Sequence, residues 1–282
     1  MKARSALALA GSVFGFVALL VTVGGSSHQV GEPALDPRLN ARASSRLSAD
    51  GSLEPGAAVT RGTLASLPEA QQAAAALALI PDAFAPRTVL LELDPSLAPG
   101  VPTISGIECH GQSGALLLGS SAHRLPKSVW LHELAHVRLH GARPQAVLAK
   151  RVITALEEGI ADDYAAVLGG SPVLGSDGEE RDLRQPPNVG PSDWASLAFP
   201  NFDPHRLGWA LGAALFAAEP RAGALLEGAL ACLDGPGPLR DADSPVSAIT
   251  SLLQSCPEPG RERFQALLRG WLPPAFLNES SP

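Results

Sequence analysis

Residues Val129–Gly141 read VWLHELAHVRLHG, and this stretch decides how the centre of the chain folds. Its residues favour an α-helix, with Pro126 suited to the first turn and Gly141 suited to the left-handed position that ends many helices. On such a helix His132 and His136 lie one turn apart on the same face, with Cβ atoms about 6 Å apart. Two imidazoles so placed can bind one metal ion, so the stretch predicts two ligands of a metal site.

A second helix is expected directly afterwards, from Pro144 to Gly170, in the sequence PQAVLAKRVITALEEGIADDYAAVLGG. Two helices joined by a short loop pack antiparallel, so this helix can present a side chain to a metal held by the first helix. The candidates for the third ligand are its acidic residues Glu157, Glu158, Asp162 and Asp163. Glu158 and Asp162 share one helical face, so one can bind the metal while the other accepts a hydrogen bond from the outer nitrogen of a ligating histidine.

This pair of motifs resembles the gluzincin metallopeptidases, the thermolysin and aminopeptidase group, in which HExxH is followed by a glutamate ligand on a later helix. Here HELAH is followed by EEGIAD, with Glu158 22 positions after His136. The resemblance covers residues 120–169 and implies three zinc ligands, His132, His136 and Glu158. It also implies Glu133 as general base and Asp162 as the hydrogen-bond partner behind a ligating histidine.

Two related patterns compete with this interpretation. Metzincins need Gly and His at the positions that Leu139 and Ala142 hold here, so they are excluded as the model. A zincin that uses Asp162 itself as the third ligand is the nearer rival. His140 lies one turn beyond His136, too far along the helix axis to reach the same ion easily.

A further histidine, His205, lies in NFDPHRLGWALGAALF, where a helical pattern begins after a long loop. Thermolysin-like enzymes stabilise the oxyanion with a histidine or tyrosine downstream of the glutamate helix, so the resemblance implies a catalytic role for His205. Its surroundings match that pattern loosely, because Gly208 comes one residue early, and a role in starting the helix is the alternative. Tyr164 is expected to pack in the core, and the long loop Ser171–Pro204 is expected to border the cleft.

Strands are expected before the motif helix, and the whole pattern indicates an α+β fold. The expected elements are a helix over Thr63–Ile80 and strands over Arg87–Asp94, Thr103–His110 and Gly114–Arg124. In zincins the strand before the motif helix forms the cleft edge, where an extended peptide can add as a strand; here that is Gly114–Ser120, with His123 nearby. We therefore expect a compact zincin-like domain with a small mixed sheet packed on the HExxH helix, followed by a mostly helical C-terminal part.

The length and composition suit one globular domain with appendages. The chain has 282 residues, of which 45% are hydrophobic and 17% charged. Its formal net charge of −7 gives no sign of the basic surface that nucleic-acid binding needs, so no nucleic-acid partner is expected. We expect the zincin-like domain over residues 61–275 and a tail over residues 276–282.

The pattern at the N-terminus predicts an export signal. Lys2 and Arg4 precede an apolar run over Ala6–Gly25, a pattern typical of a signal peptide or, if uncleaved, of a membrane anchor. We assign residues 1–25 to this signal peptide or membrane anchor, and residues 26–60, rich in Ser, Ala, Pro, Gly and Arg, to a flexible linker or pro-segment. The domain is therefore expected outside the cytoplasm, secreted, periplasmic or anchored to the membrane through its N-terminal segment.

The cysteine content fits an oxidising compartment. Among Cys109, Cys232 and Cys256, the last two would close the C-terminal helical region if they form a disulfide. Cys109 is expected as a small buried residue.

These observations favour an exported zinc-dependent peptidase, in which zinc activates a water molecule, Glu133 takes its proton, and the substrate is a peptide or protein. The alternative is a zincin-like domain that has lost catalysis and serves as a membrane-anchored binding or scaffolding module. Glu133 has no structural need to be acidic, which argues against this alternative.

Overall fold

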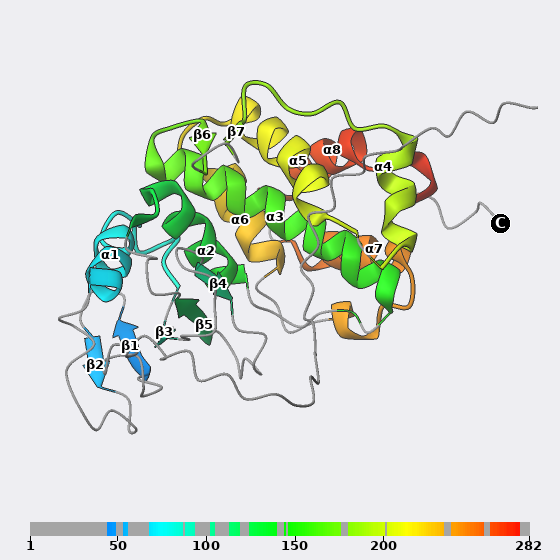
Figure 1. The fold of residues 1–282 in the computed structure, drawn as a ribbon. Coiled ribbons are helices and arrows are strands. Elements are labelled where there is room, and N and C mark those ends of the chain that lie inside the picture. The colour runs from blue at the N-terminus through cyan, green and yellow to red at the C-terminus, as the bar shows by residue number, and fades with distance from the viewer. Residues whose placement is uncertain are drawn as a thin grey trace, which may run out of the picture. The chain divides into compact units, whose positions relative to one another are not determined.

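A small mixed sheet precedes the helical part of the chain (Figure 1). The computed structural model describes residues 44–48, 53–55, 68–86, 88–93, 102–104, 113–118, 124–139, 144, 146–175, 180–200, 202–233, 238–256 and 260–276. Its strands are β1 (Ser44–Ser48), β2 (Leu53–Pro55), β3 (Thr88–Leu93), β4 (Pro102–Ile104) and β5 (Ser113–Leu118). They are hydrogen bonded in the order β2-β1-β3-β5-β4. β3 and β5 are parallel, and the other pairs are antiparallel.

The strands before the motif helix agree with the sequence in part. β3 confirms the expected strand at Arg87–Asp94, since TVLLEL is rich in β-branched and apolar residues. β4 and β5 begin one residue before the other two expected strands. Residues 105–110 and 119–123 of those two expected strands, which include Cys109 and His123, lie outside the described residues, and Arg124 is described but is not in a strand.

The assignment of residues 26–60 to a linker needs correction. Ser44–Ser48 pairs along its whole length with β3, from Ser44 opposite Glu92 to Ser48 opposite Thr88, and β2 pairs with β1 in turn. The sequences SSRLS and LEP carry one leucine each and show no apolar period. Their pairing therefore depends on the backbone groups of the neighbouring strand, which is β3 for β1 and β1 for β2. The folded unit therefore includes residues before 61.

Helices make up most of the described part of the chain, so the fold is α+β in a loose sense with a predominance of helix. They are α1 (Pro68–Leu77), α2 (Lys127–Leu139), α3 (Val147–Gly169), α4 (Pro191–Ala195), α5 (Pro204–Ala218), α6 (Ala224–Leu233), α7 (Pro245–Ser255) and α8 (Gly260–Trp271). Short 3-10 turns lie at Ser196–Ala198, Pro238–Asp241 and Pro274–Phe276. α3 is the central helix, since it contacts α2, α5, α6 and α7 (Figure 1).

The two helices that carry the motifs begin and end close to the predicted positions. α2 starts directly after Pro126 and contacts β5 and β4, so the motif helix does pack on the sheet. α3 ends with Gly170 in the left-handed conformation at φ 70°, where its N–H donates to the carbonyl of Ala166. Glycine adopts this backbone conformation without the steric cost that a Cβ brings, which explains why the helix stops there.

Core contacts and the disulfide agree with two further predictions. Tyr164 is fully buried, and its hydroxyl donates to the carbonyl of Phe84 at 3.1 Å. Cys232, in α6, and Cys256, which follows α7, form a disulfide. The pairing expected from the sequence is thus present.

The predicted N-terminal and C-terminal appendages fall largely outside the described residues. This holds for all of residues 1–25 and for residues 277–282, whereas Phe276 completes the turn that begins at Pro274. Within the part of the chain that the structure describes, no helix is both long and apolar enough to span a bilayer.

Candidate metal centre

Side chains of α2 and α3 meet in one buried cluster. His132 and His136 are 6% and 8% exposed, and Glu158 of α3 is 8% exposed. The two Nε2 atoms lie 3.1 Å apart, and each faces Glu158, with 3.2 Å from His132 Nε2 to Oε2 and 3.5 Å from His136 Nε2 to Oε1. Among the described residues, these are the three ligand-type side chains that can hold one metal ion together.

The spacing of these donor atoms fits a metal ion. Bonds of about 2.0–2.1 Å in a tetrahedral arrangement place neighbouring donor atoms about 3.3–3.4 Å apart. The observed separations of 3.1, 3.2 and 3.5 Å bracket that value. In addition, a buried carboxylate oxygen normally needs a partner, and the near neighbours of the buried Glu158 Oε2 among the described residues are two histidine nitrogens, His132 Nε2 at 3.2 Å and His205 Nε2 at 3.5 Å. A cation bound between the three side chains would satisfy it.

Asp162 lies behind His132 rather than in the donor set. Its Oδ1 is 2.9 Å from Nδ1 of His132, the ring nitrogen that points away from His136 and Glu158. Asp162 is 0% exposed. This arrangement agrees with the predicted partner that orients a ligating histidine, and it disfavours the rival in which Asp162 is itself the third ligand.

The charges of the metal-free cluster are strongly coupled. Burial alone would lower the pKa of His132, but its contacts with Asp162 and Glu158 outweigh burial and raise that pKa to about 10. Burial would raise the pKa of Glu158, but His136 and His132 hold it well below its usual range. Since a ligating nitrogen must be unprotonated, binding of a metal ion here would release a proton from His132.

Glu133 lies next to the cluster without being one of its donors. Burial raises the pKa of its carboxyl above the usual range, and the charges of His132 and His136 oppose this rise. Smaller effects come from Glu158, which raises the pKa, and His205, which lowers it. A carboxyl whose pKa is raised by burial beside a metal site is suited to accept and return a proton.

His205 faces the cluster from the first turn of α5. Its Nε2 is 3.5 Å from Glu158 Oε2, and its side chain is 49% exposed, so one side of the ring meets the cluster and the other meets solvent. Asp203, the N-cap of α5, holds the ring through a contact of 2.8 Å to Nδ1 and accepts the backbone N–H of His205 at 2.9 Å. The bond to Asp203 raises the pKa of His205. Both predicted roles, helix start and site residue, are thus compatible with its position.

Asp203 was not among the residues predicted from the sequence, although a local signal for it exists. Asp followed by Pro is a common start of a helix, with Asp as the N-cap and Pro at the first helical position. That pattern predicts a carboxylate beside the first turn of α5, where His205 lies. It does not by itself predict which side chain the carboxylate will contact.

The loop Ser171–Pro204 borders the cluster, and it contains regular structure. It includes the hairpin of β6 (Val173–Leu174) and β7 (Arg181–Asp182), and then α4. Arg181 reaches from this hairpin to Asp162, with 2.8 Å between Nη2 and Oδ1. The sequence around Arg181 carries no motif that distinguishes it from the neighbouring charged residues.

Glycines let α5 approach α3 closely enough to bring His205 to Glu158. A Cβ on Gly208 would lie 2.5 Å from Glu158 Cβ and 2.9 Å from the backbone nitrogen of Gly159. One turn later, a Cβ on Gly212 would lie 2.8 Å from the carbonyl oxygen of Gly159 and 3.0 Å from Asp162 Cβ. Helix backbones in such close contact fix the depth of α5 against the residues of the cluster.

The prediction that Gly114–Ser120 forms the edge of the cleft is wrong for Leu116–Leu118. These residues pair with β3 on one side and with β4 on the other, so β5 is an inner strand at this point. At this side of the described sheet the outer strand is β4, and at the other side it is β2. The order of strands in the sequence does not show which strand is outermost. β5 is the last strand before α2 in the chain, but β4, which comes before it, pairs with its outer side.

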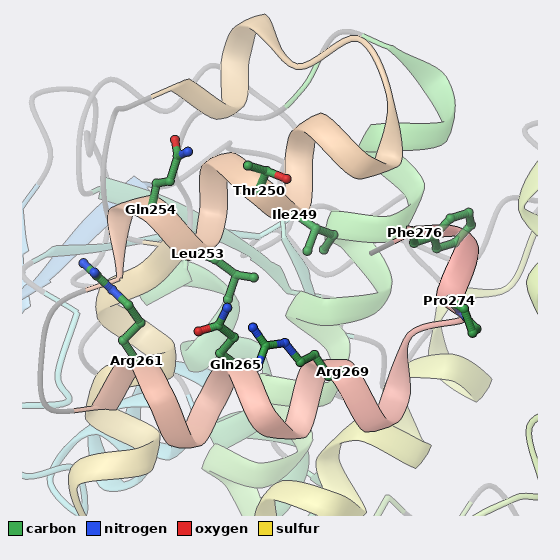
Figure 2. Close-up of a pocket in the computed structure, with 9 residues that line it drawn as sticks. All are labelled: Ile249, Thr250, Leu253, Gln254, Arg261, Gln265, Arg269, Pro274 and Phe276. Atoms are coloured by element: carbon green, nitrogen blue, oxygen red, sulfur yellow. The ribbon is translucent and has the colours of Figure 1, made fainter. Parts of the chain in front are cut away.

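A hollow of about 640 Å³ lies away from the cluster, between α7, α8 and the turn at Pro274–Phe276 (Figure 2). Apolar Ile249 and Leu253 line it together with Arg261 and Arg269, whose side chains extend from α8 toward α7 in the figure. No His, Cys, Asp or Glu is among the described residues that line it, so it offers neither a metal ligand nor a general acid or base.

Comparison with known proteins leaves the site to be interpreted from its own geometry. No protein-family model, curated protein or solved structure matches this chain. The structure brings together the predicted ligands and, around them, the predicted Glu133, Asp162 and His205. It adds Arg181 and Asp203 as two charged partners of that group.

Proposed function

We propose that this chain is a zinc-dependent peptidase of the gluzincin type. The observation that carries the proposal is the buried donor set of His132, His136 and Glu158, with Glu133 in the same helix turn as the histidines. Two imidazoles and one carboxylate are a known ligand set of catalytic zinc, and three protein ligands leave a coordination position open. The packing of α2 on a mixed sheet supports the same class of fold.

In this proposal each residue around the donor set has a separate task. Bound zinc would polarise the scissile carbonyl and lower the pKa of water at the site. Glu133 accepts the proton of the attacking water and transfers it to the leaving amine. His205, held by Asp203, donates a hydrogen bond to the oxygen on which negative charge develops, and Asp162 fixes the ring of His132.

The substrate is a peptide or protein segment in extended conformation. β4 is one of the two outer strands of the described sheet, and unlike β2 it contacts α2, so its backbone offers the groups to which an extended peptide can pair. The disulfide between Cys232 and Cys256 supports a place outside the cytoplasm, because disulfides persist in oxidising compartments. Export through the N-terminal segment, with or without retention of a membrane anchor, accords with this.

A metal site without catalysis is the competing function. A zincin-like module that has lost catalysis could use the metal for stability alone. In that module the proton chemistry of Glu133 would serve no purpose. A raised pKa at a partly buried carboxyl beside the ligands favours the enzyme.

The substitution Glu133→Gln tests the proposal, because it preserves size and removes the base. We expect about one zinc per molecule by elemental analysis in both wild type and variant. Hydrolysis of a mixed peptide library should fall by roughly 10²–10⁴ in the variant, which is the usual contribution of a general acid or base. Glu158→Ala serves as the second variant and should lose zinc.

Three results would contradict the proposal. A wild-type chain that binds iron in preference to zinc would contradict the choice of metal. A Glu133→Gln variant that cleaves peptides at the wild-type rate would contradict the mechanism. Zinc that persists in Glu158→Ala but disappears in Asp162→Ala would move the third ligand to Asp162.

A further inference from the structure

Arg181 is the described cation that contacts the carboxylate behind His132. Its Nη2 is 2.8 Å from Asp162 Oδ1, and the same oxygen lies 2.9 Å from His132 Nδ1. A guanidinium, a carboxylate and an imidazole thus form a line that ends at His132 Nε2, one of the donor atoms of the metal site.

The hairpin that carries Arg181 is fixed on both sides. Arg181 pairs with Leu174 across the hairpin, and the N–H of the buried Leu183 donates to the carbonyl of Pro172 at 2.9 Å. From α5, the indole N–H of Trp209 donates to the carbonyl of Asp182 at 3.1 Å. The backbone at Arg181 is therefore held against both α3 and α5, and its side chain has a defined origin.

The burial of Asp162 gives this contact its importance. Asp162 is 0% exposed, and an isolated carboxylate in such surroundings is costly unless a cation lies beside it. A histidine that binds a metal through Nε2 is neutral and can offer the carboxylate only the N–H of its other nitrogen. The remaining negative charge of Asp162 then depends on Arg181.

We propose that Arg181 is a positioning residue of the metal site, which acts through Asp162 to hold the ring of His132 in its ligating orientation. This role rests on the proposed metal site, but it does not depend on the reaction that the site performs. It also gives the β6–β7 hairpin a function, since the hairpin delivers a charge to the outer side of a metal ligand.

The same hairpin provides a matched control in Arg184. Arg184 is 61% exposed and pairs with Asp182 at 2.7 Å, whereas the side chain of Arg181 is 20% exposed and pairs with a fully buried carboxylate. Exposed ion pairs contribute little, because water screens them. Arg184→Met therefore removes a charge of the same kind from the same hairpin without reaching the metal site.

The experiment compares the full chain with Arg181→Met, Arg181→Lys and Arg184→Met. Zinc affinity is measured by competition with a chromophoric chelator, and the ligand geometry is followed by the visible absorption of the Co(II)-substituted protein. We expect zinc affinity to fall by about 10–100-fold in Arg181→Met, the usual effect of losing an outer partner of a ligand, with a changed Co(II) spectrum. Arg181→Lys should recover part of the affinity, and Arg184→Met should match wild type.

Thermal unfolding of the metal-free proteins separates positioning from general stability. If Arg181→Met lowers the melting temperature while zinc affinity and the Co(II) spectrum stay at wild-type values, Arg181 is structural and the proposal is overturned. Equal losses of affinity in Arg181→Met and Arg184→Met would also overturn it. A wild-type chain that binds no metal would overturn both the proposed function and this role. The two variant results above would overturn the role of Arg181 alone, so the two failures can be distinguished.

Discussion

Replacing Gly208 by alanine tests whether the close contact of α5 with α3 holds the site together. The added Cβ would lie 2.5 Å from Glu158 Cβ, 2.9 Å from the nitrogen of Gly159 and 3.0 Å from the carbonyl oxygen of Ala155. Carbon atoms in ordinary contact are about 3.5–4.0 Å apart, so α5 must move outward by about 1 Å. Two of the three obstructing atoms belong to the backbone of α3, which cannot move aside as a flexible side chain can.

The magnitude follows from two opposing effects. Overpacking of this kind costs about 1–3 kcal/mol, whereas alanine is favoured over glycine inside a helix by about 1 kcal/mol. Because the obstruction includes backbone atoms, we expect Gly208→Ala to lower the free energy of unfolding by about 1–2 kcal/mol. The nearest obstructing atom is Glu158 Cβ, so part of the strain falls on this ligand, and a shift of its carboxylate should also weaken zinc binding.

The control for Gly208→Ala is Gly270→Ala in α8. No atom lies within 4 Å of a Cβ built at Gly270, so the helix preference of alanine acts alone there and should stabilise the protein by up to about 1 kcal/mol. Urea denaturation of the metal-free proteins measures both changes, and chelator competition measures zinc affinity. The reasoning is refuted if Gly208→Ala is as stable as wild type and binds zinc equally well, or if Gly270→Ala is destabilised to the same extent.

Three further predictions follow from charges in the described part of the chain. Burial, followed by the charges of Glu219 and Asp162, raises the pKa of Asp163 well above its usual value. The folded state therefore binds this proton more tightly than the unfolded state and loses stability as pH rises. The stability of Asp163→Asn relative to wild type, measured by urea denaturation, should increase between pH 4 and pH 7, and a stability difference that stays constant over this range would contradict this. Asp203→Asn keeps an N-cap residue but removes the charge that raises the pKa of His205. NMR titration should therefore show that pKa falling, and the alkaline limit of the proposed peptidase activity should move to lower pH. An unchanged titration of His205 would be inconsistent with the contact. Removal of zinc by a chelator should lower the melting temperature. The decrease should be larger at higher pH, because metal binding requires loss of the His132 proton. A melting temperature that the chelator does not change would show that the cluster holds no metal ion.

The arrangement of residues within each motif helix could be predicted from the sequence. His132 and His136, and likewise Glu158 and Asp162, share a face because residues four apart lie one helical turn apart, and this holds in any helix. The ends of α2 and α3 were similarly marked by Pro126 and Gly170. These features depend on backbone geometry over a few neighbouring residues, so the sequence was sufficient for them.

Relations between elements required the tertiary structure. The choice of Glu158 over Asp162 as the residue facing the two Nε2 atoms depends on how far α3 is shifted along α2, which the spacing within either helix does not determine. Arg181 and Asp203 reach the cluster from a hairpin and a helix start whose positions depend on packing against α3. The pairing of β1 and β2 beside β3 likewise had no apolar period to reveal it. Local periodicity therefore determined which side chains share one face of a helix. Contacts across helices and strands determined which of these side chains meet in the cluster, because packing depends on residues that are far apart in the chain.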